Sequence, residues 1–111
     1  TPGANRYDRF VLPSGVEIYG GFAGTETDRG QRNWRRNPTL LSGEIANPSV
    51  PTDNCYHVVY ASLTSSNTVL DGFTVTGGYS DENKSSGGGG LYGSQGDLKV
   101  VNCTFRDNWS P

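Results

Sequence analysis

One basic cluster in the sequence places an aromatic ring among several cations. Trp34 lies between Arg32 and the pair Arg35 and Arg36, with Arg29 just upstream. An indole ring can stack on a sugar ring, and guanidinium groups bind carboxylates through two parallel hydrogen bonds. We therefore take Trp34, Arg35 and Arg36 as candidate ligand contacts, with a glycan as the ligand. The alternative is that Trp34 covers the side of the fold while the arginines stay in water.

Carboxylates are the second group that could do chemistry, because glycoside hydrolysis and calcium binding both need several of them together. The candidates are Asp71, Asp81, Glu82, Asp97 and Asp107. Two of them, Asp71 and Asp107, fall at expected turns, where Asp binds the local backbone. We find neither a catalytic pair nor a calcium motif. The prediction is that the chain has no catalytic residues, no metal site and no cofactor.

The remaining reactive side chains are one histidine and two cysteines. His57 lies in an apolar run, 56–59, that predicts a strand, so we expect it to have a packing or hydrogen-bonding role. No second histidine offers zinc-ligand spacing. Cys103 is expected in the core. A disulfide between Cys55 and Cys103 stays open, because an oxidising compartment would permit it and spacing alone cannot decide it.

Composition and charge exclude several classes of protein. The chain has 111 residues, 16 glycines and a net charge of −2. No apolar run approaches the roughly 18 residues that cross a bilayer. A dedicated nucleic-acid binder would carry a basic excess, which this chain lacks. We expect neither a membrane span nor a nucleic-acid partner.

The elements that must position these side chains are short strands. Apolar runs rich in Val, Thr, Tyr, Phe and Ile recur, and each ends at turn residues. We expect strands within 9–12, 16–19, 39–41, 56–61, 69–76, 91–92 and 98–105. Residues 25–38 read as a loop excursion with at most one helical turn, and 79–90 as a polar loop rich in Gly and Ser. The chain is predicted to be all-β.

An internal repeat relates two of these segments. Residues 69–78 align with 99–108 at an offset of 30, and 59–62 align with 91–94 at an offset of 32. Stacking of such repeats brings equivalent side chains together in ladders. The expected core ladders are Leu70 with Val100, Phe73 with Cys103, and Val75 with Phe105. Thr74 and Thr104 are expected to form an outward ladder, and Ile18 and Leu41 to face inward in an earlier coil.

The apolar spacing inside the repeat predicts a bend. Apolar residues occupy positions 1, 4 and 6 of the unit, whereas a straight strand would place them at 1, 3 and 5. The extra residue falls at Gly72 and at Asn102. Gly and Asn are the residues that enter the left-handed region most readily. We expect both to form the same tight corner between two strands of a coil.

The segments 18–27, 40–45, 56–59 and 70–78 resemble a bacterial right-handed parallel β-helix repeat protein. The C-terminal part resembles the polymorphic outer-membrane protein repeat, through the tetrads 89–92 (Gly-Gly-Leu-Tyr) and 105–108 (Phe-Arg-Asp-Asn). The resemblance implies a pectate-lyase-like superfold in a large, secreted or surface-attached protein. It implies no activity, because a fold alone does not assign one.

The expected architecture is one right-handed parallel β-helix (β-solenoid) segment over 1–111, with three to four coils. Neither end carries an evident polar cap, so we expect a fragment of a longer chain. Its partners would be the remainder of its own chain or neighbouring copies that stack on the open coil ends.

The expected function is a non-catalytic extracellular or bacterial cell-surface module, structural or adhesive, whose rigid face binds a polysaccharide. Two alternatives stay open. One is part of a polysaccharide lyase or hydrolase, which predicts that Asp71, Asp81, Glu82, Lys84 and Arg106 converge on one outward face. The other is a self-assembling surface or filament component.

Overall fold

The computed structural model describes residues 1–81, 83 and 87–111. Within these residues the elements are short strands and two single turns of 3-10 helix, η1 (Arg29–Gln31) and η2 (Pro51–Asp53). The strands are β1 (Phe10–Val11), β2 (Glu17–Tyr19), β3 (Thr39–Ser42), β4 (Val59–Ser62), β5 (Val69–Asp71), β6 (Phe73–Thr76), β7 (Leu91–Ser94), β8 (Lys99–Val101) and β9 (Thr104–Arg106). The all-β prediction is confirmed, and η1 is the one helical turn expected in the excursion.

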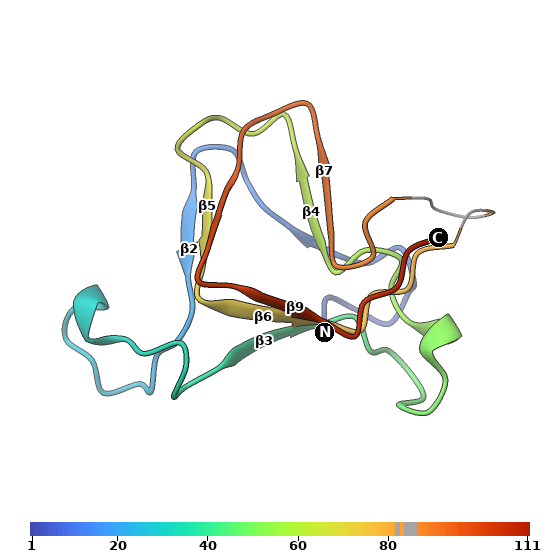
Figure 1. Ribbon diagram of the computed structural model, residues 1–111, viewed down its shortest axis with the longest axis horizontal. Coiled ribbons are helices and arrows are strands. Elements are labelled where there is room, and N and C mark those ends of the chain that lie inside the picture. Colours follow the sequence, from blue (N-terminus) through green and yellow to red (C-terminus); the bar gives the residue numbers. More distant parts are fainter. Residues whose placement is uncertain (82, 84–86) are drawn as a thin grey trace.

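The strands form three sheets of three parallel strands each (Figure 1). Their orders are β1-β4-β7, β2-β5-β8 and β3-β6-β9. The chain therefore visits the three sheets in the same order in three successive passes, and each pass adds one strand to each sheet. Because parallel neighbours cannot be joined by a hairpin, every connection within a sheet runs through the other two sheets.

The register of the sheets confirms both offsets of the repeat. Leu70 pairs with Val100 and Val75 with Phe105, at the offset of 30. Residues 59–62 pair with 91–94 one to one, at the offset of 32. The printed pairing of β6 with β9 begins at Thr74 and Thr104, so the expected pair of Phe73 and Cys103 lies just outside that ladder. Both of these residues pack at the core.

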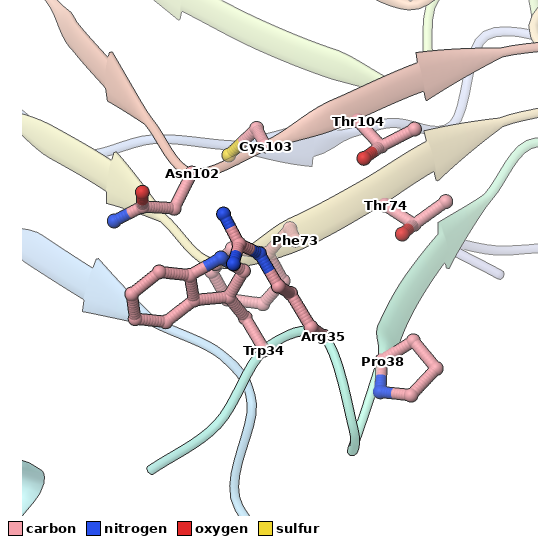
Figure 2. Close-up of a pocket in the computed structure, with 9 residues that line it drawn as sticks. Trp34, Arg35, Pro38, Phe73, Thr74, Asn102, Cys103 and Thr104 are labelled. Carbon is pink, nitrogen blue, oxygen red and sulfur yellow. The ribbon is translucent and has the colours of Figure 1, made fainter.

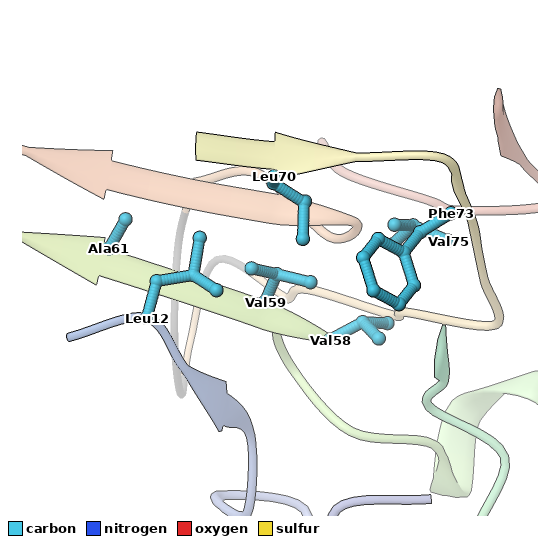
Figure 3. Packing of buried hydrophobic residues seen from close by; sticks show 7 residues of the cluster. All are labelled: Leu12, Val58, Val59, Ala61, Leu70, Phe73 and Val75. Carbon is cyan, nitrogen blue, oxygen red and sulfur yellow. The ribbon is translucent and has the colours of Figure 1, made fainter. Parts of the chain in front are cut away.

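The hydrophobic core lies between the three sheets (Figure 3). The second pass supplies most of its buried side chains, including Val59, Leu70 and Val75, which are fully buried. Ile18 and Leu41 of the first pass pack against them, as expected. Burial of such side chains is the main stabilising term in a fold of this size.

Burial at the third pass differs from the prediction. Val100 and Phe105 continue the core ladders in register, yet they remain 40% and 43% exposed. The reason is geometric, because their strands β8 and β9 are each the last strand of a sheet. A core side chain in a stacked sheet is covered by neighbours on both sides, and these two have a neighbour on one side.

The predicted corners are confirmed. Gly72 has φ of +85° and Asn102 has φ of +52°, both in the left-handed region. The corners stack, because the N–H of Gly20 donates to the carbonyl of Asp71 and that of Gly72 to the carbonyl of Val101. Gly20 thus occupies the same corner in the first pass.

The strand predicted over 56–61 is wrong at its start, because β4 begins at Val59. Residues before it bond to loop backbone instead: the N–H of Tyr56 donates to the carbonyl of Arg6, and that of Val58 to the carbonyl of Gly89. His57 lies in this connection. Its Nδ1 is 2.8 Å from the Gly88 carbonyl oxygen, and its ring packs on Tyr92.

Candidate functional site

The candidate site forms where the first pass carries an insertion. In the second pass Gly72 alone separates β5 from β6, and in the third pass only Asn102 and Cys103 separate β8 from β9. In the first pass residues 20–38 separate β2 from β3, slightly more than the expected 25–38. This excursion projects beyond the three sheets in Figure 1 and returns to the corner it left.

Arg32 holds the excursion against the corner. Its Nη2 lies 2.8 Å from Oδ1 of Asp71, and its Nη1 donates to the Gly20 carbonyl at 2.9 Å. The two charged side chains are only 9% and 12% exposed. Nδ2 of Asn102 donates to the same Asp71 oxygen at 3.0 Å. One carboxylate thus joins the excursion to the corner of the third pass.

Glycine permits the close approach of the excursion to the corner. Gly21 has φ of +96°, and a Cβ there would lie 2.7 Å from the Cα of Trp34. Its carbonyl accepts a hydrogen bond from the N–H of Asn33 at 2.8 Å. Oδ1 of Asn33 in turn accepts from the N–H groups of Arg35 and Arg36. Asn33 therefore fixes the backbone that carries Trp34, Arg35 and Arg36, through its own N–H and through its side-chain oxygen.

A hollow of about 440 Å³ lies between the excursion and the third sheet (Figure 2). Trp34, Arg35 and Pro38 line it from the excursion. The corners and the first residues of β6 and β9 line it from the sheet, including Thr74 and Thr104, which are direct neighbours in register. The predicted outward ladder of threonines is thus confirmed as one wall of this hollow.

Two of the three sequence-predicted contacts meet at the hollow. Trp34 is half-buried and Arg35 is exposed, and both line it. Arg36 is also exposed but is not part of the lining. The sequence did not indicate that Trp34 would meet the threonine ladder, because no repeat relates the excursion to the strands. Pro38 was missed for the same reason.

Cations cover the aromatic rings beside the hollow. The Arg32 guanidinium carbon lies 4.8 Å from the centroid of the Trp34 ring and 5.0 Å from that of Tyr19. Arg29 lies 4.2 Å from the Tyr19 centroid. Burial raises the pKa of the Tyr19 phenol, and its hydrogen bond to Glu17 raises it further. The Tyr19 phenol is therefore uncharged at physiological pH, and its ring contacts the two cations. The Arg32 guanidinium is already bound by Asp71 and the Gly20 carbonyl.

Arg35 is the cation in the lining that reaches solvent. A guanidinium presents several N–H donors in one plane, and the two threonine hydroxyls can both donate and accept. Together with one indole, this set suits a flat, polar ligand with a negative charge. The geometry offers recognition groups rather than a nucleophile with an adjacent base.

The acidic candidates do not assemble a second site. Asp71 pairs with Arg32, Asp81 with Arg6 at 3.5 Å, and Asp107 with Arg106 at 2.8 Å. Within residues 1–81, 83 and 87–111, no three His, Cys, Asp or Glu side chains come close enough to hold a metal ion. Two further candidates of the hydrolase alternative, Glu82 and Lys84, lie outside the described residues, as does part of the predicted loop 79–90.

Both cysteines are free thiols, which closes the alternative of a disulfide between them. Cys55 is buried, with its Sγ 3.9 Å from the Asn5 carbonyl oxygen. Cys103 lines the hollow, and its Sγ lies 3.5 Å from the carbonyl oxygen of Leu70. Burial raises the pKa of the Cys55 thiol, so this sulfur stays protonated and unreactive.

Comparisons of this chain with protein-family models, with curated proteins and with solved structures return no match. In the part of the chain that the structure describes, no helix has the length and apolar character needed to span a bilayer.

Proposed function

We propose that this chain is a segment of a right-handed parallel β-helix that serves outside the cell as a non-catalytic structural or adhesive module. Three observations support the β-helix: three passes through the same sheets, parallel pairing throughout the described strands, and equivalent corners at Gly72 and Asn102. The resemblance to surface-attached repeat proteins supports the extracellular or cell-surface location. Such a stack presents a rigid lateral face to a partner.

The ligand we propose for this face is an acidic glycan bound in the hollow beside the excursion. The observation that carries this proposal is the meeting of Trp34 and Arg35 with the ladder of Thr74 and Thr104. A uronic acid offers a carboxylate to Arg35, hydroxyls to the threonines and a ring to the indole.

A non-catalytic role is supported by the ion pairs described above. Asp71 holds the excursion in place, and the Asp81 and Asp107 carboxylates pair with arginines elsewhere on the molecule. None of these three lines the hollow. Binding without turnover is therefore the expected behaviour toward a polysaccharide.

Titration calorimetry with trigalacturonate, and with neutral maltotriose as the control ligand, tests the proposal. Arg35→Ala and Arg36→Ala form a matched pair, because the two residues are adjacent, equally charged and both exposed, and only Arg35 lines the hollow. We expect Arg35→Ala to weaken trigalacturonate binding about tenfold, as for loss of one charge-assisted contact. Arg36→Ala should change it by less than about twofold.

Three results would contradict the proposal. Equal loss of affinity in both variants would place the ligand elsewhere on the basic excursion, and absence of binding by the wild type would remove the glycan altogether. If the protein released new reducing ends or unsaturated sugars from polygalacturonate, the hydrolase or lyase alternative would be supported in place of a binding module.

A further inference from the structure

Three buried oxygen atoms in the loop between β3 and β4 have no hydrogen-bond donor. They are Oε1 of Glu44, Oδ1 of Asp53 and Oδ1 of Asn54, and none of them has a partner among the described residues. Asn54 as a whole is only 4% exposed. The large majority of buried side-chain polar atoms in native proteins are paired. These three acceptors therefore need a partner other than the part of the chain that the structure describes.

The loop that carries these atoms closes on itself. The N–H of Cys55 donates to the carbonyl of Gly43 at 2.9 Å, so a backbone hydrogen bond joins the two ends of segment 44–54. Inside the segment, the N–H of Val50 donates to the carbonyl of Asn47 at 2.8 Å, and η2 follows directly. Figure 1 shows this loop on the opposite side of the sheets from the excursion.

The base of this loop gathers the residues that carry the three oxygens. A Cβ at Gly77, in the second pass, would lie 3.3 Å from the backbone nitrogen of Glu44 and 3.5 Å from Nδ2 of Asn54. The Asn54 amide therefore lies beside Glu44, although the two residues are at opposite ends of the loop. Asp53 directly precedes Asn54. The fold thus brings two carboxylates and one amide to the same place.

The described residues supply no cation to these oxygens. Segment 44–54 contains no lysine, arginine or histidine. The Arg6 guanidinium reaches the same region, but its Nε donates to the backbone carbonyl of Asn54 at 2.8 Å. Its Nη1 donates to the Tyr56 hydroxyl and to Asp81. Two buried carboxylate oxygens without a donor or a cation would raise the free energy of the fold.

We propose that Glu44, Asp53 and Asn54 form a binding site for a calcium ion. Calcium takes six to eight oxygen ligands from carboxylates, amide and backbone carbonyls, and water. The two carboxylates balance its charge, and the Asn54 amide oxygen is a neutral third ligand. Zinc prefers nitrogen and sulfur ligands, and magnesium keeps several of its own waters, so both fit this set less well.

This site departs from the expectation that the chain holds no metal ion. The acidic candidates named from the sequence did not include Glu44 or Asp53, because neither belongs to a recognisable calcium motif. The site has only two acidic side chains, and its third ligand is an amide. The feature that marks it is the burial of acceptors without donors, which depends on the tertiary structure.

A bound ion would fasten the first pass to the second. Segment 44–54 is the connection between β3, the last strand of the first pass, and β4, the first strand of the second. An ion that binds both ends of this connection holds the loop closed. Because the ion binds the folded chain and not the separated ligands of the unfolded chain, calcium should stabilise the fold.

Titration calorimetry of the EDTA-treated and dialysed chain with calcium chloride tests the site. We expect a Kd of about 0.1–1 mM, because only two of the side-chain ligands are charged. Magnesium chloride should bind at least about tenfold more weakly. Glu44→Gln and Asp53→Asn keep the shape of each side chain and remove its charge, and each should weaken calcium binding about tenfold or more.

Glu17→Gln and Asp107→Asn are the matched controls. They make the same chemical changes at carboxylates that form exposed ion pairs with arginines. Asp107 has φ of +55°, a conformation that Asn also accepts. Both controls should bind calcium within about twofold of the wild type, since exposed ion pairs contribute little.

Thermal unfolding separates loss of the ion from loss of the fold. Without calcium, Glu44→Gln and Asp53→Asn should unfold at the same temperature as the wild type or higher, because each removes a buried charge that lacks a partner. Calcium chloride at about 10 mM should raise the unfolding temperature of the wild type more than magnesium chloride does, and it should raise that of the two variants little.

A wild type that binds no calcium up to about 10 mM would overturn the proposal and leave ordered water as the partner of these oxygens. Unchanged binding in Glu44→Gln and Asp53→Asn, or equal loss in the controls, would also overturn it, because the ion would then lie elsewhere. Glu44, Asp53 and Asn54 do not line the glycan hollow, and the experiment uses the metal alone. This proposal and the glycan proposal can therefore fail independently.

Discussion

Arg32 and Asp71 form the ion pair that joins the 20–38 excursion to the corner of the second pass. Nη2 and Oδ1 are 2.8 Å apart, and both side chains are nearly buried. Asn102 donates to the same oxygen from the third pass, and Gly20 accepts from the same guanidinium in the first. One ion pair therefore contacts the equivalent corner of all three passes and positions the wall that carries Trp34.

Arg32→Ala should destabilise the protein strongly, because it leaves the Asp71 carboxylate nearly buried without its cation. Removal of one partner of a buried ion pair costs about 3–5 kcal/mol. Arg29→Ala is the matched control, since its 3.6 Å contact with Glu17 is exposed and such pairs contribute about 0–1 kcal/mol. Urea denaturation followed by circular dichroism measures both. Similar midpoints for the two variants would show that Arg32 does not anchor the excursion.

The corner at Gly72 should not tolerate a side chain, whereas Gly93 should. A Cβ at Gly72 would lie 2.8 Å from the Gly20 carbonyl oxygen, on a backbone with φ of +85°. At Gly93, within β7, the nearest atom to a Cβ is the Ala61 carbonyl oxygen at 3.9 Å. We expect Gly72→Ala to cost about 2 kcal/mol or more, from strain and displaced neighbours. Gly93→Ala should be neutral or stabilising by up to about 1 kcal/mol.

Asn102 contributes to the third corner in two ways that substitutions can separate. Asn102→Gly keeps the left-handed backbone and loses the hydrogen bond to Asp71, which contributes about 1 kcal/mol. Asn102→Ala loses the bond and adds backbone strain, for a total of about 2 kcal/mol. Thermal unfolding should therefore rank wild type above Asn102→Gly, and Asn102→Gly above Asn102→Ala. A reversed order of the two variants would contradict the role of the corner.

The two thiols should differ in reactivity in the folded protein. Cys55 is fully buried and its thiol pKa is raised, whereas Cys103 is half-buried at the hollow. Iodoacetamide at pH 8 followed by peptide mass spectrometry should modify Cys103 first and Cys55 only after unfolding. Folding raises the pKa of the Cys55 thiol. The contribution of the buried thiol to the stability of the fold is therefore complete below the ordinary thiol pKa, and it declines as the pH rises through the pKa of Cys55 in the folded protein. Equal labelling of the two cysteines would contradict this burial.

Glu26 should make the tip of the excursion sensitive to acid. Its carboxylate accepts hydrogen bonds from the N–H groups of Ala23 at 2.7 Å, Gly24 at 2.9 Å and Thr25 at 3.1 Å, and these bonds lower its pKa. These hydrogen bonds fully order residues 23–25 above the ordinary pKa of a carboxyl group. The ordering is lost as the pH falls through the lower pKa that Glu26 has in the folded protein. Amide NMR shifts of residues 23–25 between pH 6 and 2 report this change. In Glu26→Gln the same shifts should be nearly independent of pH.

Much of the sheet structure could be predicted from the repeat. An offset of 30 residues aligned Leu70 with Val100 and Val75 with Phe105, and the structure contains these pairs. The corner at Gly72 and Asn102 followed from one extra residue in the apolar spacing. These predictions succeed because pairing in stacked passes repeats along the chain, so each pass carries the same information as its neighbour.

The candidate site could be predicted only in part. The residue types of Trp34 and Arg35 indicated a glycan contact, but their meeting with Thr74 and Thr104 depends on how an insertion folds back onto the sheet. No periodic pattern relates the excursion to the strands, and the Arg32 contact with Asp71 that directs it joins residues far apart in the sequence. The exposure of Val100 and Phe105 likewise depends on which strand lies beside them.

The amino-acid sequence by itself therefore determined the strand ladders and the two left-handed corners, since local spacing and backbone preference act within a few residues. The tertiary structure alone decided that Arg32 is occupied, that Arg35 rather than Arg36 lines the hollow, and that both cysteines remain thiols. Each of these depends on a distance between segments that the local sequence does not encode.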